Sequence, residues 1–277
     1  MARLLEVSKS GYYSRMKKQS KPSKRRQWRD QRDHQIRVAF KETHGRFGSP
    51  RLTSYLNDKG LRVCVNTVAE SMRRLGLSAG TQVKKKQTTF SNNSLQTAKN
   101  ILGRDFAVDS RQPAWASDIT YIKTKESWLY LAVVINLRSR RVLGFSTGSS
   151  LTQDLVIEAL KMAINTKSAT KDTIHHSDRG SQYCSKRYRK LLTFFGFKIS
   201  MSRLGECYDN AVVESFFGHL KREIQVKKFI KKSYSETESE IHHYLHWYNS
   251  ERLHSSLAQQ SPLDFERQLC LAKTDST

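Results

Sequence analysis

A run of residues, 128–137 (WLYLAVVINL), is apolar at almost every position. A strand with one face in water alternates apolar and polar residues, whereas an unbroken apolar run suits a strand that is buried on both faces. The preceding segment 115–123 (WASDITYIK) does alternate, and it is rich in β-branched and aromatic residues. The sequence therefore predicts a sheet built around these two strands, with 128–137 at a buried central position.

The elements that follow come in an order typical of one fold class. A third strand is expected at 141–147, and the short connections between the first three strands favour antiparallel pairing. Helices and strands then alternate. They are a helix over 152–165, a strand over 173–177, a helix over 185–195, a strand over 197–200 and a helix from 209 or 210 to about 226. This order predicts an α/β domain with a ribonuclease H-like core, in which a mixed five-stranded sheet has flanking helices.

The N-terminal region has a different pattern, that of short helices. Apolar periodicity and breakers predict helices over 29–43 and 51–58, and a third with Asn66 as its N-cap and Gly76 at its end. Two short helices joined by a turn in a basic region suggest a helix-turn-helix over about 45–77, with Arg73 and Arg74 exposed as candidate DNA contacts. A small helical bundle with a solvated basic face is the alternative.

Charge indicates the class of partner. The formal net charge is +24, and residues 1–99 hold 23 Lys and Arg against 6 Asp and Glu. A compact fold with this much positive charge repels itself, so a polyanionic partner is the simplest reason to keep it. Nucleic acid is preferred to an acidic membrane surface, and charge does not distinguish DNA from RNA.

Composition divides the chain into four segments. We expect an N-terminal helical region over 1–80, a basic linker over 81–105, the catalytic core over 106–232, and a C-terminal helical segment with a short tail after Pro262 over 233–277. The four cysteines form no CxxC pair, which argues against a zinc module and favours a reducing cytoplasm. Neither a signal segment nor a run of membrane-spanning length is found, so no membrane is expected.

Three acidic residues stand where an acid is unexpected. Asp118 interrupts the strand 115–123, Asp178 ends the strand 173–177, and Glu214 lies among apolar residues one turn into the last core helix. A buried carboxylate is unfavourable unless it is paired or binds a cation, and sites gather at strand ends. Each acid alone has an ordinary explanation as a surface acid or a helix-terminal charge. Together they match the layout for metal-dependent phosphodiester chemistry.

The segments WASDITYIK, HHSDRGSQY and SMSRLGECYDNAVVESFFGHLKRE closely resemble the catalytic blocks of insertion-sequence transposases of the OrfB type, in the retroviral-integrase superfamily. The 35 residues between Asp178 and Glu214 are typical of that group. HGRFGSPRL resembles its helix-turn-helix, and HWYNSERLHSSL its C-terminal signature. Two positions depart from the pattern: Asn136 stands where Asp is usual, and Glu206 where Asn or Asp is usual.

The resemblance implies a DNA transposase with Asp118, Asp178 and Glu214 as catalytic and metal-binding residues. It implies two Mg²⁺ ions, for which Mn²⁺ would substitute, and cleavage and transfer of DNA strands at the ends of an insertion element. Two alternatives remain at this point. One is a ribonuclease H-like nuclease that cuts without joining, and the other is a non-catalytic DNA-binding regulator from an inactive element.

Supporting residues and partners complete the prediction. Asn210 and Lys221 share a helix stripe with Glu214, so both could contact DNA, although Asn210 could instead cap the helix and Lys221 could be an ordinary exposed lysine. Arg179 could meet phosphate, and Gly180 would allow a close backbone approach. The resemblance implies double-stranded DNA and a companion OrfA-type protein as partners. A homo-oligomer on DNA and a nucleoid-associated cytoplasmic location are also expected.

Overall fold

The computed structural model describes residues 8–20, 23–79, 97–106, 113–166, 169–204 and 206–274. The chain divides into two compact units, Met1–Gly80 and Thr81–Thr277. Residues 81–96 of the predicted linker lie outside the described residues. Within the described part, no helix is long and apolar enough to cross a membrane.

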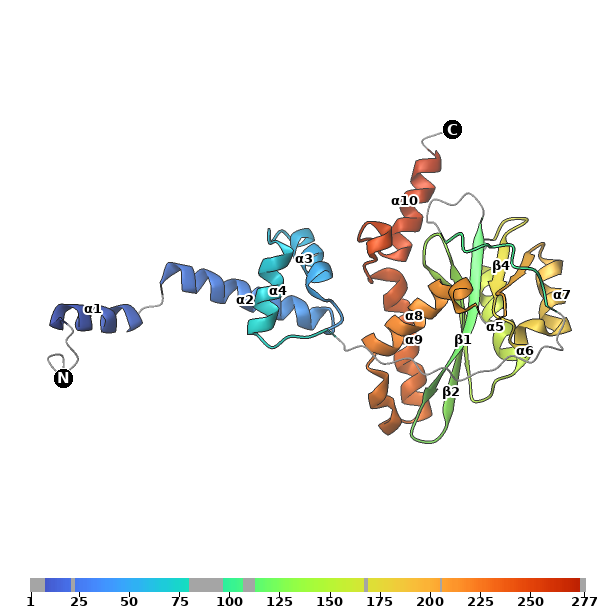
Figure 1. The fold of residues 1–277 in the computed structure, drawn as a ribbon, viewed down its shortest axis with the longest axis horizontal. Coiled ribbons are helices and arrows are strands. Elements are labelled where there is room, and N and C mark those ends of the chain that lie inside the picture. The colour runs from blue at the N-terminus through green and yellow to red at the C-terminus, as the bar shows by residue number, and fades with distance from the viewer. Residues whose placement is uncertain are drawn as a thin grey trace. The chain divides into compact units, whose positions relative to one another are not determined.

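The first unit is helical (Figure 1). Its helices are α1 (Lys9–Ser20), α2 (Lys24–Glu42), α3 (Ser49–Asp58) and α4 (Val65–Arg74). The last three helices pack on one another, and Ile36, Leu52 and Val68 are fully buried. The N-cap of α4 is Cys64, so the prediction of Asn66 as the cap was wrong: Asn66 lies in the first turn, and no side chain caps α4.

The second unit contains a mixed five-stranded sheet in the order β3-β2-β1-β4-β5. The strands are β1 (Ala114–Lys123), β2 (Trp128–Asn136), β3 (Val142–Gly148), β4 (Ile174–Ser177) and β5 (Lys198–Met201). The first three pair antiparallel as expected, whereas β4 and β5 run parallel to β1. The apolar run β2 lies between β1 and β3 with most of its residues buried, which confirms the prediction made from its composition.

Helices cover both faces of this sheet (Figure 1). They are α5 (Gln153–Asn165), α6 (Ser181–Cys184), α7 (Lys186–Phe194), α8 (Ala211–Glu223), α9 (Tyr234–Ser250) and α10 (Pro262–Thr274), with 3₁₀ turns η1 (Cys207–Asn210), η2 (Val226–Lys231) and η3 (Ser255–Leu257). The core that includes Trp115, Leu143 and Leu160 lies between the sheet and α5 to α7. On the other side, α8 packs on β1, and α9 on β2 and β3.

Two C-terminal features differ from the sequence-based expectation. The last core helix was predicted to continue to about residue 226, but α8 ends at Glu223 because Gln225 takes a left-handed backbone conformation (φ 52°). The short tail expected after Pro262 is instead the helix α10. Pro262 is its first residue, where a missing N–H and a fixed φ favour helix initiation.

Candidate active site

The two aspartates reach the same place because β1 and β4 are parallel neighbours. Ser117 of β1 is the register partner of Ser177 of β4, so Asp118 and Asp178 are the next residues on adjacent strands. β4 ends at Ser177, which leaves this edge of β1 open beyond Asp118. An open edge at the carboxyl end of a parallel strand is a common location for a site in an α/β sheet.

Both aspartates lie in an environment that disfavours negative charge. Burial raises the pKa of Asp118 well above its usual value, and the nearby charges of Asp178 and Glu214 raise it further. Burial also raises the pKa of Asp178. The backbone N–H of Ile119 donates to Oδ1 of Asp118 (2.7 Å), and the backbone N–H of Gly180 donates to Oδ1 of Asp178 (2.9 Å). The pair is therefore short of positive charge, and a cation would supply it.

Glu214 is brought to the aspartates by α8. The side-chain amide of Asn210, directly before α8, donates to the carbonyl oxygen of Ser117 (3.4 Å) and so holds the start of the helix on β1. Glu214 is the fourth residue of the helix and is within electrostatic reach of Asp118. In this conformation, no three Asp, Glu, His or Cys side chains of the described residues form a metal-ligating group. The three carboxylates therefore lie near one another but do not converge on one metal position.

Lys221 follows Glu214 by two turns and lies beside the same cluster. Its ammonium lies 5.4 Å from the ring centroid of Tyr121 on β1, and it is half-buried. Burial lowers the pKa of Lys221, and the charge of Asp118 partly opposes that shift. A partly desolvated cation next to an acidic site can meet a phosphate there.

The turn after Asp178 is built for close approach. A Cβ on Gly180 would lie 3.0 Å from Oδ1 of Asp178 and 3.2 Å from Oε1 of Gln182, so a side chain at this position would crowd the carboxylate. The close backbone approach expected at Gly180 stays a prediction. Arg179 donates from Nε to the carbonyl of Ser202 (2.7 Å), which fixes the base of its guanidinium.

Two histidines of β4, His175 and His176, are buried directly before the site. Nε2 of His175 is within hydrogen-bond distance of the Ser117 (2.9 Å) and Tyr188 (3.1 Å) hydroxyls. His176 has the hydroxyls of Ser200 and Ser202 at its two ring nitrogens. Burial lowers the pKa of His175 to about 3 and that of His176 to about 4, so both rings are neutral at pH 7.

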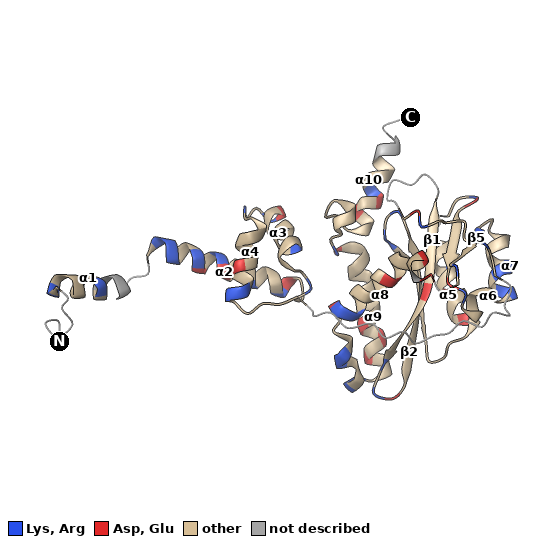
Figure 2. Cartoon of the chain, in the orientation of Figure 1, with Lys and Arg blue, Asp and Glu red and all other residues tan. Residues whose placement is uncertain are grey.

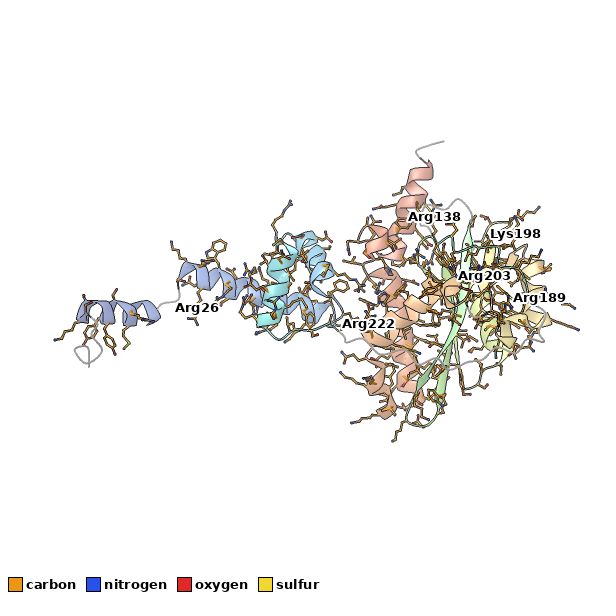
Figure 3. All side chains as sticks on the ribbon, viewed as in Figure 1. Arg26, Arg138, Arg189, Lys198, Arg203 and Arg222 are labelled. Carbon is orange, nitrogen blue, oxygen red and sulfur yellow. The ribbon has the colours of Figure 1, made fainter. Side chains whose placement is uncertain are left out.

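From the sequence, Asp209 was expected only as a possible first residue of the last core helix, and the structure gives it a larger role. Its fully buried carboxylate accepts hydrogen bonds from the side chains of Asn100 (2.8 Å), Arg104 (2.7 Å) and Arg203, which Figure 3 labels. These contacts, with that of Arg203 the strongest, lower the pKa of Asp209. Residues 97–105, which were predicted as linker, thereby bind to the loop that leads into α8. The only sequence feature that could have pointed to this role of Asp209 is its position next to Asn210, at the start of the last core helix.

The remaining predicted contact residues differ in their surroundings. Arg73 of α4 is exposed, whereas Arg74 forms two hydrogen bonds with Asp33 of α2 (2.6 and 2.8 Å). Asn210 is buried against β1. Asn136 accepts from the N–H of Arg138, and Glu206 pairs with Arg104. Neither departure from the family pattern therefore involves the three acidic residues.

Comparison with known proteins gives the same assignment along the chain. Residues 110–207 and 195–262 match models of an integrase core domain, and residues 27–86 match an HTH-like domain. The transposase InsF for insertion sequence IS3A of Escherichia coli (strain K12) is 40% identical over 268 residues, covering 96% of this chain and 92% of that protein. The insertion element IS600 31 kDa protein of Shigella sonnei is 37% identical over 266 residues, covering 96% and 97%.

A solved structure agrees with the fold. The simian T-cell lymphotropic virus intasome, determined in complex with PP2A regulatory subunit B56 gamma, matches with a TM-score of 0.50 and 16% identity. The match covers 83% of this chain and 73% of that one. The predicted ribonuclease H-like α/β core, with an N-terminal helix-turn-helix-like region, is thus confirmed.

Proposed function

The chain belongs to the IS3-type insertion-sequence transposases with an integrase core, and from this premise we propose that Asp118, Asp178 and Glu214 form its catalytic centre. Its activity is that of a DNA transposase of the DDE type. The observation that supports the assignment is the register of β1 and β4, which sets Asp118 and Asp178 on adjacent strands in a buried, like-charged pair.

An integrase-core transposase uses divalent metal ions, and the donors present fit such an ion. The site offers carboxylate oxygens, which hard cations such as Mg²⁺ prefer, and its aspartates repel each other until a cation is present. We propose two Mg²⁺ ions, with Mn²⁺ as a substitute, held by Asp118, Asp178 and Glu214. When bound, the ions would activate the attacking water or 3′-hydroxyl and stabilise the leaving oxygen.

The residues around the carboxylates have separate roles in this proposal. Gly180 keeps the space beside Asp178 open and its N–H orients that carboxylate. Asn210 fixes α8 on β1, and so sets the position of Glu214 relative to Asp118. Lys221 and Arg179 neutralise DNA phosphates next to the reacting one. No covalent intermediate between protein and DNA is needed, because the attacking group is water or a DNA hydroxyl.

DNA is also bound by the first unit, whose HTH-like domain spans residues 27–86. We propose Arg73 of the exposed face of α4 as a contact. Arg74 is exposed but paired with Asp33, and Asn210 is buried against β1, so contact with DNA stays a prediction for both. The proposed segments are the DNA-binding region 1–80, the basic linker 81–105, of which residues 97–105 are held on the core, the catalytic core 106–232 and the C-terminal segment 233–277.

Two further partners follow from the reaction. Joining two element ends requires them to be held together, so we propose a homo-oligomer assembled on DNA of the bacterial nucleoid. We also propose a companion OrfA-type protein that supplies a second helix-turn-helix. Sedimentation with and without DNA, and with the companion added, tests both.

The decisive experiment is strand transfer with a labelled duplex carrying the terminal repeats that flank the coding region. The full chain is expected to join the labelled 3′ end to a second DNA only when Mg²⁺ is present. The Asp178→Asn variant should bind DNA but neither cut nor join it. Cutting without joining would favour the ribonuclease H-like nuclease, and binding without either reaction by the unaltered chain would favour the regulator.

A further inference from the structure

The segment after the catalytic helix has a strongly one-sided charge pattern. In the 3₁₀ turn η2, three residues make one turn, so side chains three positions apart share a face. Val226, Phe229 and Lys232 form one such line, in which Phe229 is fully buried. The other two lines hold Lys227, Lys228 and Lys231, all exposed, together with Ile230. Burial of Phe229 therefore forces three lysines outward together.

A second basic segment lies against η2. The backbone N–H of Lys125, in the β1–β2 hairpin, donates to the carbonyl of Lys232 directly after η2 (2.9 Å), and β1 itself contacts η2. Lys123 and Lys125 of the hairpin are exposed, and the Lys123 ammonium lies 5.2 Å from the ring centroid of Trp128. We call the five lysines the basic ridge. They are Lys123, Lys125, Lys227, Lys228 and Lys231. Figure 2 shows several blue Lys and Arg segments beside and below the α9 label.

The acids near the ridge are engaged elsewhere. Glu240 pairs with Lys232, Glu126 accepts the N–H of Tyr234 (2.8 Å), and Glu236 forms the capping box of α9 with Ser233. Within the described part of the chain, none of the five ridge ammonium groups forms an ion pair with an acid. Glu236 interacts electrostatically with Lys125, but the five lysines together keep an excess of positive charge, so the ridge is suited to a polyanion.

We infer that the basic ridge binds the phosphate backbone of the DNA duplex on which the active site acts, an inference that rests on the proposed function. The ridge follows α8, which carries Glu214 and has Lys221 and Arg222 in its last turn; Figure 3 labels Arg222. From Glu214 to the end of α8 is about 14 Å, which corresponds to about four base-pair steps. A duplex that runs along α8 with its reacting phosphate at Glu214 would therefore reach the ridge within about half a helical turn.

The chemistry of the ridge points to backbone contact without base reading. Lysine is a flexible point charge that suits phosphate, whereas base recognition uses planar donors such as Arg, Asn or Gln in a groove. The ridge contains no such donor. It should therefore hold DNA of any sequence and position it relative to the carboxylates.

Salt dependence of DNA binding tests the inference directly. The full chain is mixed with a short labelled duplex of arbitrary sequence in EDTA, so that no reaction can occur, and affinity is measured between about 50 and 200 mM salt. Each lost phosphate contact lowers the slope of log affinity against log salt by about 0.9, so replacing Lys227, Lys228 and Lys231 by Gln should lower it by about 2.7. Replacing the same three by Arg should preserve the slope.

The matched control removes equal charge from the other end of the core. Lys171, Lys186 and Lys190 are exposed residues before β4 and on α7, and their triple Gln variant should keep the slope of the unaltered chain. Equal slopes for the ridge and control variants would overturn the inference. So would a ridge variant that binds DNA normally but changes its sedimentation, because that outcome assigns the ridge to a protein contact. Since binding is measured without metal, failure of the carboxylate assignment would leave this result unaffected.

Discussion

Ser117 and Ser177 are register partners in the parallel pair of β1 and β4, and each is followed directly by an aspartate. Neighbouring strands lie about 4.8 Å apart, so this single register relation is enough to bring two carboxylates from distant parts of the chain together. Because both are desolvated, their pKa values rise. This arrangement of two buried carboxylates creates a local instability that a bound cation would remove.

The first prediction concerns that instability. Asp178→Asn keeps an oxygen that can accept the Gly180 N–H but removes one of the two like charges, so it should raise the stability of the metal-free protein by about 1 kcal/mol, or about 2–4 °C. Mg²⁺ should raise the melting temperature of the unaltered chain and have little effect on the variant. Thermal unfolding with and without Mg²⁺ measures both effects. A larger Mg²⁺ shift in the variant would contradict the assignment.

The second prediction concerns Gly180. A methyl group at this position would lie 3.0 Å from the Asp178 carboxylate, so Gly180→Ala should displace that carboxylate and lower strand-transfer activity by about 10- to 100-fold. Its backbone φ is −57°, a value that alanine adopts freely, so the fold should be kept. Gly218→Ala on α8 is the control, since a Cβ there meets nothing within 4 Å. Equal activity of the two variants would show that Asp178 tolerates the crowding.

The elements of this fold were predictable where the signal is local. Period-two alternation identified β1, and the unbroken apolar run identified β2. The contacts of Asp209 were not predictable, because Arg104 is 105 residues away in sequence and no local pattern links them. The end of α8 was missed for a different reason: Gln225 is an ordinary helix former, yet it takes a positive φ between the buried residues Ile224 and Phe229. The three acids were singled out by their places together, in a strand, after a strand and among apolar residues of a helix, and by the resemblance of the segments that hold them to a known family.

The third prediction concerns the buried ion pair that joins α8 to the C-terminal segment. Arg252 is 1% exposed and bonds through Nε and a terminal nitrogen to Glu223, the last residue of α8, which also accepts the Tyr244 hydroxyl (2.8 Å). Arg252→Met should destabilise the protein by about 3–5 kcal/mol, because it leaves Glu223 buried without its cation. Adding Glu223→Gln should restore part of that loss. Urea denaturation of the two single variants and the double variant measures the coupling.

The control for this pair is an ion pair of similar geometry on the surface. Arg187 and Asp154 have side chains that are 59% and 60% exposed, and exposed pairs contribute only about 0–1 kcal/mol. Arg187→Met should therefore have a small effect. If Arg252→Met were equally mild, the C-terminal segment would not fix the end of the catalytic helix.

The fourth prediction is a dependence of stability on pH that arises from His176. Its pKa is lowered to about 4 in the folded protein, compared with about 6.5 in the unfolded chain. Between these values the unfolded state binds the proton and the folded state does not, so this residue lowers the stability as the pH falls, by about 1.4 kcal/mol per pH unit and about 2 kcal/mol between pH 7 and 5. Asp118 and Asp178, with raised pKa values, act in the opposite direction, so the comparison must be made between variants.

His176→Asn should lose stability more slowly than the unaltered chain when urea denaturation is repeated at pH 7 and pH 5, whereas His246→Asn, at an exposed position on α9, should follow the unaltered chain. Identical pH dependence in all three proteins would mean that His176 takes up its proton in the folded state, and that burial does not hold the ring neutral.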